Sequence, residues 1–279
     1  MIKLKKTLIT TAAIAAFVIR SRRLSVVKYE IFSDKVRGKV RLALMADLHS
    51  HTHGKNQRKL IAAIEAHNPD AVLMAGDIAD HITPHRNTKI LLRELAAKKY
   101  PVYYVSGNHE YKGGEIEEIK RFFRRLGANV LEGCCREIIV GDNRLTVCGV
   151  DDVVIGAKAF HGQLQNCASR TNRQDFSVLL AHRPEKMNLY AKLHFDLILS
   201  GHVHGGQVRI PRITNGIYAI HQGFFPKYVG GLYHVGGNAR CKLIVSRGLS
   251  KSWRGVPRVF NPPELVIIDI VQKRRITPL

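Results

Sequence analysis

The most informative segment of this chain reads Gly201-His202-Val203-His204-Gly205-Gly206-Gln207. It follows the apolar run 195–199, which predicts a buried strand, and its glycines allow the backbone to turn sharply at the strand end. Two histidines one residue apart can then direct their imidazoles at one point. The segment is typical of a metal-binding loop, although a histidine pair is weak evidence by itself in a chain with 14 histidines.

Four further apolar runs, at 40–46, 71–75, 102–105 and 176–180, predict strands that also end in metal-competent side chains. The side chains at the five strand ends are Asp47, His49, Asp77, Asn108, His182, His202 and His204. Because ligands bind outside the carboxyl ends of the strands in an open α/β sheet, we expect these residues to converge. Seven oxygen and nitrogen ligands are too many for one tetrahedral zinc, so the set indicates two metal ions, each manganese, iron or zinc.

Helical patterns separate the first three strands and indicate a βαβαβ first half. Apolar residues recur at helical spacing in 56–67, 87–98 and 115–126, and Gly127 is a C-terminal signal for the third helix. Later, Pro184 opens a helix between two strands, whereas the last two strands, at 242–246 and 265–271, follow without helices. The pattern predicts an α/β fold with a two-sheet core and helices outside.

The five blocks occur in the order Asp-x-His, Gly-Asp-x-x-Asp, Gly-Asn-His-Glu, His and Gly-His-x-His. In this order the chain resembles the calcineurin-like metallophosphoesterase superfamily, over about residues 40 to 270. The end of the chain, with Val245-Ser246-Arg247-Gly248-Leu249 and 258–265, is similar to a membrane-associated branch. That branch includes YkuE- and YaeI-type phosphodiesterases and a UDP-2,3-diacylglucosamine pyrophosphohydrolase. The resemblance implies a four-layer α-β-β-α sandwich with two mixed sheets.

The resemblance also implies a role for each block. One metal ion would be held by Asp47, His49, Asp77 and His204, and Asp77 would bridge to a second ion completed by Asn108, His182 and His202. His109 would face the scissile phosphate without binding metal, and Asp80 would fix its orientation. Asn108 and His109 would also contact substrate, while Glu110, where many relatives have Asp, lies outside the ligand set.

The chemistry accounts for these residue types without the resemblance. Two cations about 3.5 to 4 Å apart clamp a phosphate oxygen and acidify a water for in-line attack. A positioned imidazole such as His109 can protonate the departing oxygen. Arg247, together with Arg254 and Arg258, offers planar forked donors for a substrate phosphate, although a chain with 44 Lys and Arg has many such residues.

The N-terminal 39 residues differ from the body of the chain, which we take as one catalytic domain over 40–279. Residues 7–19 are uncharged and lie between Lys3, Lys5 and Lys6 on one side and three arginines on the other. The run is shorter than the roughly 20 residues of a spanning helix, so we expect an uncleaved membrane-proximal segment, with a signal peptide as the alternative. The formal net charge of +22 would attract anionic lipid headgroups, phosphorylated substrates or nucleic acid.

The five cysteines, including the adjacent Cys134 and Cys135, form no Cys-x-x-Cys motif. We therefore expect neither a zinc finger nor a disulfide scaffold, which favours a reducing compartment and the cytoplasmic face of a membrane. We also expect structural loop or cap roles for Asp151 and Asp152, and solvated positions for His51 and His53.

The prediction is a binuclear metal-dependent phosphodiesterase or pyrophosphohydrolase that acts on a lipid or nucleotide-lipid at an anionic membrane surface. A nuclease or nucleotide phosphodiesterase of the same superfamily is the first alternative, because the charge would serve a nucleic-acid backbone equally well. No series of base-stacking aromatics favours it, since aromatics are 7% of the chain. A non-catalytic scaffold is a distant alternative, because the ligand set and His109 are complete. No protein partner is inferred.

Overall fold

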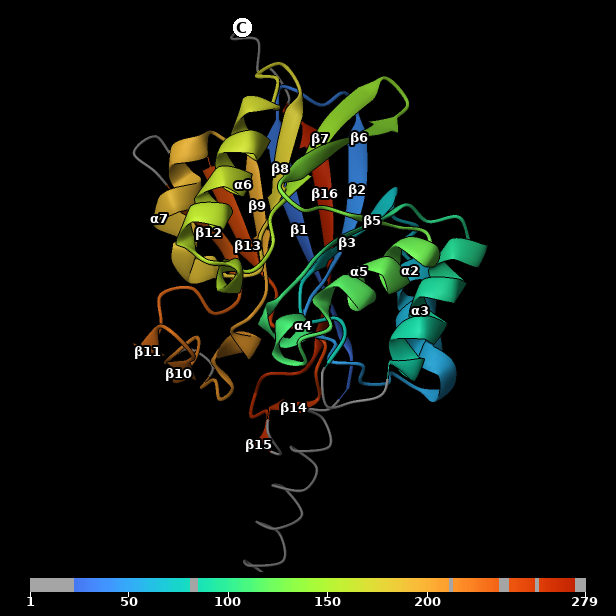
Figure 1. The fold of residues 1–279 in the computed structure, drawn as a ribbon, viewed down its shortest axis with the longest axis vertical. Helices are drawn as coiled ribbons and strands as arrows, with labels where there is room; N and C mark the ends of the chain where they lie inside the picture. The colour runs from blue at the N-terminus through green and yellow to red at the C-terminus, as the bar shows by residue number, and fades with distance from the viewer. Residues whose placement is uncertain (1–22, 81–84, 211–212, 236–240, 254–255, 274–279) are drawn as a thin grey trace, which may run out of the picture.

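Two six-stranded sheets pack face to face, with helices on both outer faces (Figure 1). The structure is a computed structural model and describes residues 23–80, 85–210, 213–235, 241–253 and 256–273. In Figure 1, α6 and α7 lie on one side of the sheets, and α2, α3 and α5 lie on the other. This arrangement is the four-layer α-β-β-α sandwich with two mixed sheets that the sequence predicts.

The first sheet has the order β1-β16-β2-β3-β4-β5. Strands β2, β3, β4 and β5 run parallel, as the βαβαβ pattern requires, and β16 is antiparallel to β2. The strands of this sheet are β1 (Ser25–Ser33), β2 (Lys39–Met45), β3 (Ala71–Ala75), β4 (Val102–Val105), β5 (Ala128–Val130) and β16 (Glu264–Gln272).

The second sheet has the order β12-β13-β9-β8-β7-β6. Its four central strands β13, β9, β8 and β7 are parallel, and an antiparallel strand closes each edge. The strands of this sheet are β6 (Cys134–Val140), β7 (Asn143–Gly149), β8 (Phe176–Leu180), β9 (Leu197–Ser200), β12 (Gly231–Val235) and β13 (Cys241–Val245).

Amphipathic helices cover the sheets as their periodicity predicts. Leu60, Ile61 and Ile64 of α2 are buried against the first sheet, beside the buried Leu91 and Leu95 of α3. The helices are α2 (Arg58–Glu65), α3 (Arg86–Ala97), α4 (Asn108–Lys112), α5 (Ile116–Arg125), α6 (Ala157–Ser169) and α7 (Met187–Tyr190). Short 3-10 turns and two small ribbons complete the described elements. The ribbons are β10 (Tyr218–Ala219) with β11 (Gly223–Phe224), and β14 (Ser252–Trp253) with β15 (Val256–Pro257).

The main core lies between the two sheets. Leu44, Leu73 and Val105 of the first sheet are buried in one cluster with Val178 and Leu199 of the second. Such a core holds the carboxyl ends of β2, β3, β8 and β9 at one end of the molecule, near α4 in Figure 1. The strand ends that carry the candidate ligands are therefore fixed by packing between the sheets.

Residues 25–33, which the sequence analysis assigned to the N-terminal segment, form β1 of the first sheet. β1 pairs in parallel with β16 from Ser25 opposite Glu264 to Ser33 opposite Gln272. The predicted membrane-proximal run 7–19 lies outside the described residues. No helix in the described part of the chain combines the length and the apolar character needed to cross a membrane.

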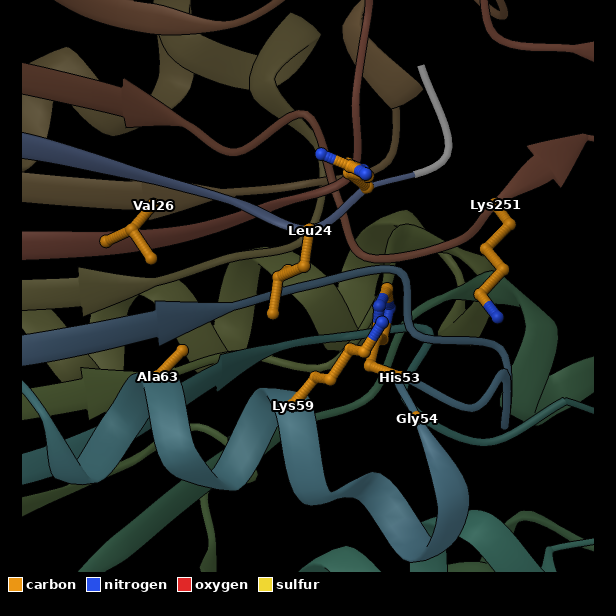
Figure 2. A pocket seen from close by; sticks show the side chains of 8 residues that line it. Leu24, Val26, His53, Gly54, Lys59, Ala63 and Lys251 are labelled. Atoms are coloured by element: carbon orange, nitrogen blue, oxygen red, sulfur yellow. The ribbon is translucent and has the colours of Figure 1, made fainter. Parts of the chain in front are cut away.

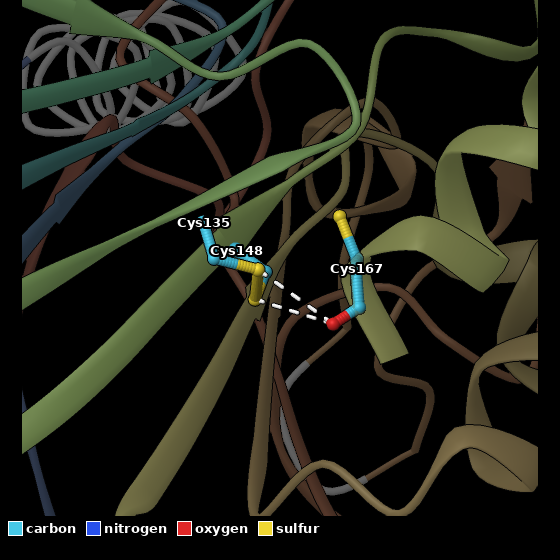
Figure 3. A group of neighbouring side chains, drawn as sticks. All are labelled: Cys135, Cys148 and Cys167. Carbon is cyan, nitrogen blue, oxygen red and sulfur yellow. Dashed lines mark hydrogen bonds between the residues drawn. A yellow bond between two sulfur atoms is a disulfide. The ribbon is translucent and has the colours of Figure 1, made fainter. Parts of the chain in front are cut away.

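The expectation of no disulfide is wrong for Cys135 and Cys148, which are bonded to each other (Figure 3). The two residues lie directly opposite on β6 and β7, with their Cα atoms 3.9 Å apart. Cys167 of α6 packs beside the bond, and its carbonyl oxygen lies 3.6 Å from the sulfur of Cys135. Cross-strand register, which spacing in the sequence does not reveal, brings the pair together.

Candidate metal centre

The predicted ligands lie at the carboxyl ends of strands from both sheets. Asp47 and His49 follow β2, Asp77 follows β3, and His182 follows β8. His202 and His204 follow β9, and Asn108 begins α4 directly after β4. All but Asn108 are buried to at least nine tenths, so the structure brings the set together out of solvent.

The backbone at these positions is unusual. Asp47, His49, Asp77, His202 and His204 all have positive φ, between 47° and 74°. Non-glycine residues in this region cost free energy, of order 1–3 kcal/mol each, and cluster at functional sites. The sharp turns direct consecutive strand-end side chains toward a common point instead of to alternate faces.

Asp47, His49 and His204 form one group of side chains. Each offers a ligand atom, and these atoms lie within 4.8 Å of one another. Nε2 of His204 is 3.7 Å from Oδ1 of Asp47, and both carboxylate oxygens of Asp47 accept the backbone N–H of His202 at 3.0 Å. Asp47 is thereby held between the two sheets.

Asp77, His182 and His202 form a second group with the same spacing limit. Nε2 of His182 is 3.3 Å from Oδ2 of Asp77 and 3.2 Å from Nδ1 of His202. Nδ1 of His182 is 2.7 Å from the carbonyl oxygen of Ala75, which can only accept, so Nδ1 carries a proton and Nε2 is the atom that points toward the group.

The two groups adjoin through Asp77. Nε2 of His49, in the first group, lies 3.8 Å from Oδ2 of Asp77, in the second. The other carboxylate oxygen of Asp77 accepts the backbone N–H of His109 at 2.8 Å. A short carboxylate that contacts both groups is the arrangement expected for a bridging ligand.

His109 and Asp80 lie beside the first group. Oδ1 of Asp80 is 3.5 Å from Nδ1 of His109, and its Oδ2 is 3.3 Å from Nδ1 of His49. The rings of His49 and His109 meet edge to face with centroids 4.4 Å apart. Nε2 of His109 lies 3.0 Å from Nζ of Lys112, one turn later in α4.

Two glycines leave room for the carboxylates of Asp77 and Asp47. A Cβ atom at Gly107 would overlap Oδ1 of Asp77, and one at Gly201 would lie 2.6 Å from Oδ2 of Asp47. Any side chain there would displace a candidate ligand, so these positions require glycine for space rather than for conformation.

The unpaired polar atoms fit metal ions. Nε2 of His49 and Oδ1 of Asn108 are buried and have no hydrogen-bond partner among the described residues. Buried polar atoms are normally paired, and lone pairs of this kind gathered around carboxylates are what divalent cations bind. The donor set contains oxygen and nitrogen without thiolate, which suits manganese, iron or zinc.

Electrostatics at the site favours cations. Burial alone would lower the pKa of His182, but the carboxylates of Asp77 and Asp47 outweigh it and raise the pKa to about 10. Burial raises the pKa of Asp47 to about 6, assisted by the negative charge of Asp77. The protein thus places negative charge in a buried volume, which raises the pKa of His182, whereas burial and neighbouring positive charge lower the pKa of His202 and of His204 well below the usual value.

Sequence reasoning missed the residues that hold the ligands. The carboxylate of Glu110 accepts the backbone N–H groups of Gly107, Asp77, Ile78 and Ala79 at 2.8 to 3.1 Å. A carboxylate near the glycine of Gly-Asn-His-Glu is visible in the sequence, but its four partners follow from the fold.

His204 is supported by the last part of the chain. Nδ1 of His204 is 2.9 Å from the hydroxyl of Ser250, which also accepts an N–H of Arg258 at 2.9 Å. Arg258 is buried, and another of its N–H groups donates to the carbonyl of Arg247 at 2.7 Å. Nδ1 of His204 also lies 3.3 Å from Nη2 of Arg258, so Ser250 and Arg258 together orient the ring with Nε2 toward Asp47.

Other candidates of the sequence analysis have different surroundings. The guanidinium of Arg247 forms an ion pair with Glu264 at 2.5 Å, and its contact with substrate stays a prediction. Arg254 lies outside the described residues. Asp152 caps a 3-10 turn by accepting the N–H of Val154, which confirms its predicted cap role, and it also pairs with Arg183.

The prediction that His53 is solvated is wrong, because it is buried with Nε2 2.7 Å from the carbonyl of Leu249. His51 is half-buried. His221, outside every motif block, is exposed but lies with Nδ1 3.1 Å from Nε2 of His202. These contacts come from segments distant in sequence, so local composition does not reveal them.

The model for the calcineurin-like phosphoesterase family matches residues 40–206. The chain belongs to this family. The family uses a binuclear divalent metal centre, and the two groups of candidate ligands described above are placed accordingly.

The relatives are uncharacterized metallophosphoesterases. The chain is 31% identical over 244 residues to Cj0846 of Campylobacter jejuni, which covers 84% of this chain and 60% of that protein. It is 26% identical over 219 residues to YkuE of Bacillus subtilis, with coverage of 76% and 72%. The chain spans only about half to two thirds of the length of the first curated relatives it matches.

A solved structure shares the fold. TT1561 of Thermus thermophilus aligns with a TM-score of 0.53 at 12% identity, covering 76% of this chain and 91% of that one. This likeness supports the sandwich architecture alone.

Proposed function

We propose that this protein is a binuclear metal-dependent phosphoester hydrolase that acts on a phosphodiester or pyrophosphate linkage. The observation that carries the proposal is the junction of two buried ligand groups at Asp77, with 3.8 Å between its Oδ2 and Nε2 of His49. Membership of the calcineurin-like phosphoesterase family supports it.

Each group of side chains would hold one ion. The first ion would be held by Asp47, His49, Asp77 and His204, and the second by Asp77, Asn108, His182 and His202. When bound, two divalent cations supply the positive charge that polarises a phosphoester and acidifies the attacking water. The protein fixes the ligands by burial and by the backbone bonds to Asp47 and Glu110.

His109 would move a proton. Asp80 lies beside Nδ1 and favours the proton on that atom, which orients the ring and leaves Nε2 toward the side that Lys112 reaches. When Nε2 is also protonated, it can donate to the departing oxygen of the substrate. Asp80 is thus a positioning residue, and His109 is the proposed catalytic acid.

The proposed substrate is a lipid or nucleotide-lipid phosphoester at a membrane surface. The net charge of +22 and the basic N-terminal sequence around the uncharged run 7–19 support this choice, because both attract anionic headgroups. The cysteine argument for the cytoplasmic face does not hold, since the Cys135–Cys148 bond is typical of oxidising compartments. We therefore propose a membrane-associated enzyme and give equal weight to export.

Turnover of bis-p-nitrophenyl phosphate by the manganese-loaded protein tests the enzyme claim. We expect Asp77→Asn to abolish turnover and lower the bound metal. We expect Asp175→Asn, which changes a half-buried residue in the loop between α6 and β8, to leave both unchanged. Equal turnover in the two variants, or far fewer than two ions per chain in the unmodified protein, would overturn the proposal.

A substrate panel then separates lipid phosphoesters from the nuclease alternative. The same preparation is offered lipid-linked diphosphates, nucleotide diesters and labelled DNA. Preferred turnover of DNA would contradict the lipid proposal while leaving the phosphoesterase intact.

A further inference from the structure

A cationic pocket lies at the start of β1, and none of the candidate metal ligands lines it (Figure 2). It is a cavity of about 430 Å³ between the start of β1, helix α2 and the loop after β13. Its lining residues are Arg23, Leu24, Val26, His53, Gly54, Lys59, Ala63 and Lys251. None of them belongs to the predicted ligand set or to the catalytic pair.

The charge of the pocket is of one sign. Three of the eight lining residues are cations, Arg23, Lys59 and Lys251, and no carboxylate is among the eight. Figure 2 shows Lys59 reaching toward His53 from α2, and Lys251 extending from a different segment. Cations from three distant segments that share one concave space create a strong positive potential, which favours an anion of matching size.

Local backbone features place the two lysines. Gly54 has φ of +77°, and a Cβ atom there would lie 2.9 Å from Cγ of Lys59, so the glycine allows the lysine stem to cross it. The backbone N–H of Lys251 donates to Nδ1 of His51 at 3.2 Å. The pocket is therefore built by fixed backbone and is more than a chance gathering of surface side chains.

One wall of the pocket is apolar. Leu24 and Val26 of the first strand region face Ala63 of α2 across the cavity (Figure 2). Val26 is 37% exposed, so its side chain is accessible from the cavity. A phosphate alone would leave this wall in water, whereas an amphiphile would cover it.

The pocket and the metal centre share one loop. The carbonyl of Leu249 bonds to His53 in the pocket, the Ser250 hydroxyl bonds to His204 in the metal centre, and Lys251 lines the pocket again. The segment 1–22, with its lysines and uncharged run, enters the described structure at Arg23. A membrane-associated chain would bring this pocket close to lipid.

We propose that this pocket binds the phosphate headgroup and the first acyl carbons of an acidic lipid, as a site separate from the metal centre. The lysines and Arg23 would hold the phosphate, and Leu24, Val26 and Ala63 would cover the acyl carbons. This site requires no turnover, so its test and the test of the proposed function fail independently.

Binding of a soluble probe tests the site without vesicle attachment through the N-terminal segment. The full-length protein is titrated with dihexanoyl phosphatidic acid below its micelle concentration, with glycerol 3-phosphate and inorganic phosphate as arms that lack acyl chains. The pocket variant is Lys59→Glu with Lys251→Glu. The matched control is Lys39→Glu with Lys89→Glu, two exposed lysines outside the pocket with the same change in net charge.

We expect the pocket variant to weaken phosphatidic acid binding by about tenfold or more, since two favourable charges become two repulsive ones, and the control to stay within about twofold. Leu24→Ser should weaken the binding of phosphatidic acid and leave the binding of glycerol 3-phosphate unchanged. Equal loss of phosphatidic acid affinity in the pocket variant and the control would overturn the proposed site, because overall charge alone would then explain the binding. If Leu24→Ser leaves the affinity for dihexanoyl phosphatidic acid unchanged, the pocket does not bind acyl carbons, and its ligand is a free phosphate instead of a lipid.

Folding and the basal chemistry are followed in parallel. The pocket variant should retain its thermal unfolding temperature and its turnover of bis-p-nitrophenyl phosphate, because no pocket residue belongs to the proposed catalytic set. Asp77→Asn should show the opposite pattern, with binding kept and turnover lost. Loss of phosphatidic acid binding in Asp77→Asn would place the probe in the metal centre and overturn the separate site.

Discussion

Glu110 joins two strand ends of the first sheet through its four accepted N–H bonds, three from residues after β3 and one from Gly107 after β4. One of those donors belongs to Asp77, the carboxylate shared by the two ligand groups. Because the side chain is fully buried, water cannot replace it. A residue outside the ligand set therefore determines where the central ligand lies.

Glu110→Ala should destabilise the protein by about 3 kcal/mol or more, since each buried donor left without a partner costs about 1–3 kcal/mol. Bound manganese should fall as well, because the loop that carries Asp77 loses its anchor. Urea unfolding and metal analysis measure the two effects. Glu110→Asp should recover part of both, because it keeps the carboxylate, and a fully stable alanine variant would contradict the role.

His53 should make stability sensitive to acid. Burial lowers its pKa to about 4, from about 6.5 in an unfolded chain, so the folded state holds it neutral while the unfolded state takes up a proton. The free energy of unfolding therefore keeps its full value above about pH 6.5 and falls as the pH drops toward 4. At about 1.36 kcal/mol per pKa unit, His53 accounts for a loss of up to about 3 kcal/mol.

Urea unfolding of the protein and of His53→Gln at pH 7 and pH 5 checks this sign. The variant should lose less free energy of unfolding between the two pH values than the unmodified protein. His161→Gln, an exposed histidine on α6, serves as the control and should show the full loss. Parallel pH profiles for all three proteins would count against a buried neutral His53.

At the scale of elements, the strands with continuous apolar runs were predictable and the edge strands were not. β2, β3, β4, β8 and β9 are buried on both faces, so each reads as an apolar run followed by a polar end. β1 alternates exposed and half-buried residues, and its partner β16 lies at the other end of the sequence. Pairing over such a separation leaves no local signal.

The candidate site divides in the same way. Asp47, His49 and the histidine loop stand next to strand ends and could be found by position. Ser250 and Arg258 support His204 from the last quarter of the chain, where no strand-end pattern marks them. The ligands were therefore predictable from local pattern, whereas the side chains that orient them depend on tertiary contacts.

The hairpin β6–β7 should depend on its disulfide. The bond closes a loop with a sequence separation of 13, for which loop-closure entropy predicts a contribution of about 3 kcal/mol. Cys135→Ser with Cys148→Ser should lower the free energy of unfolding by that amount, and dithiothreitol should do the same to the unmodified protein. Cys134→Ser, outside the bond, should keep the full response to dithiothreitol. Indifference of the unmodified protein to reduction would rule out a stabilising disulfide.

At the scale of the molecule, the metal centre connects the two halves of the sandwich. Asp47 and Asp77 extend from the first sheet, and His182, His202 and His204 extend from the second. Without bound ions, this junction gathers carboxylates and a protonated His182 in a buried volume. Ions that bind both sheets therefore contribute to how the sheets hold together, in addition to any chemistry.

Removal of metal should thus destabilise the whole domain. Each ion present at about 100 times its Kd contributes about 2.7 kcal/mol, so EDTA should lower the Tm by about 10 °C when two ions are lost. Hydrogen exchange should rise together at the ends of β2, β3, β8 and β9, because these strand ends carry the ligands. Asp77→Asn should start near the lower Tm and respond little to EDTA, whereas Asp175→Asn should respond in full.

The stabilisation by manganese should also increase with pH. Burial would lower the pKa of His182, but the neighbouring carboxylates of Asp77 and Asp47 raise it to about 10. At neutral pH this imidazole must therefore release a proton before it can bind an ion. Protons and metal compete at the same Nε2, and apparent affinity rises as protons become scarce. Calorimetric titration at pH 6 and pH 8 should show tighter binding at the higher value and proton release at both. Binding that is tighter at pH 6 would mean that His182 is not a ligand and that the second ion is held by other groups.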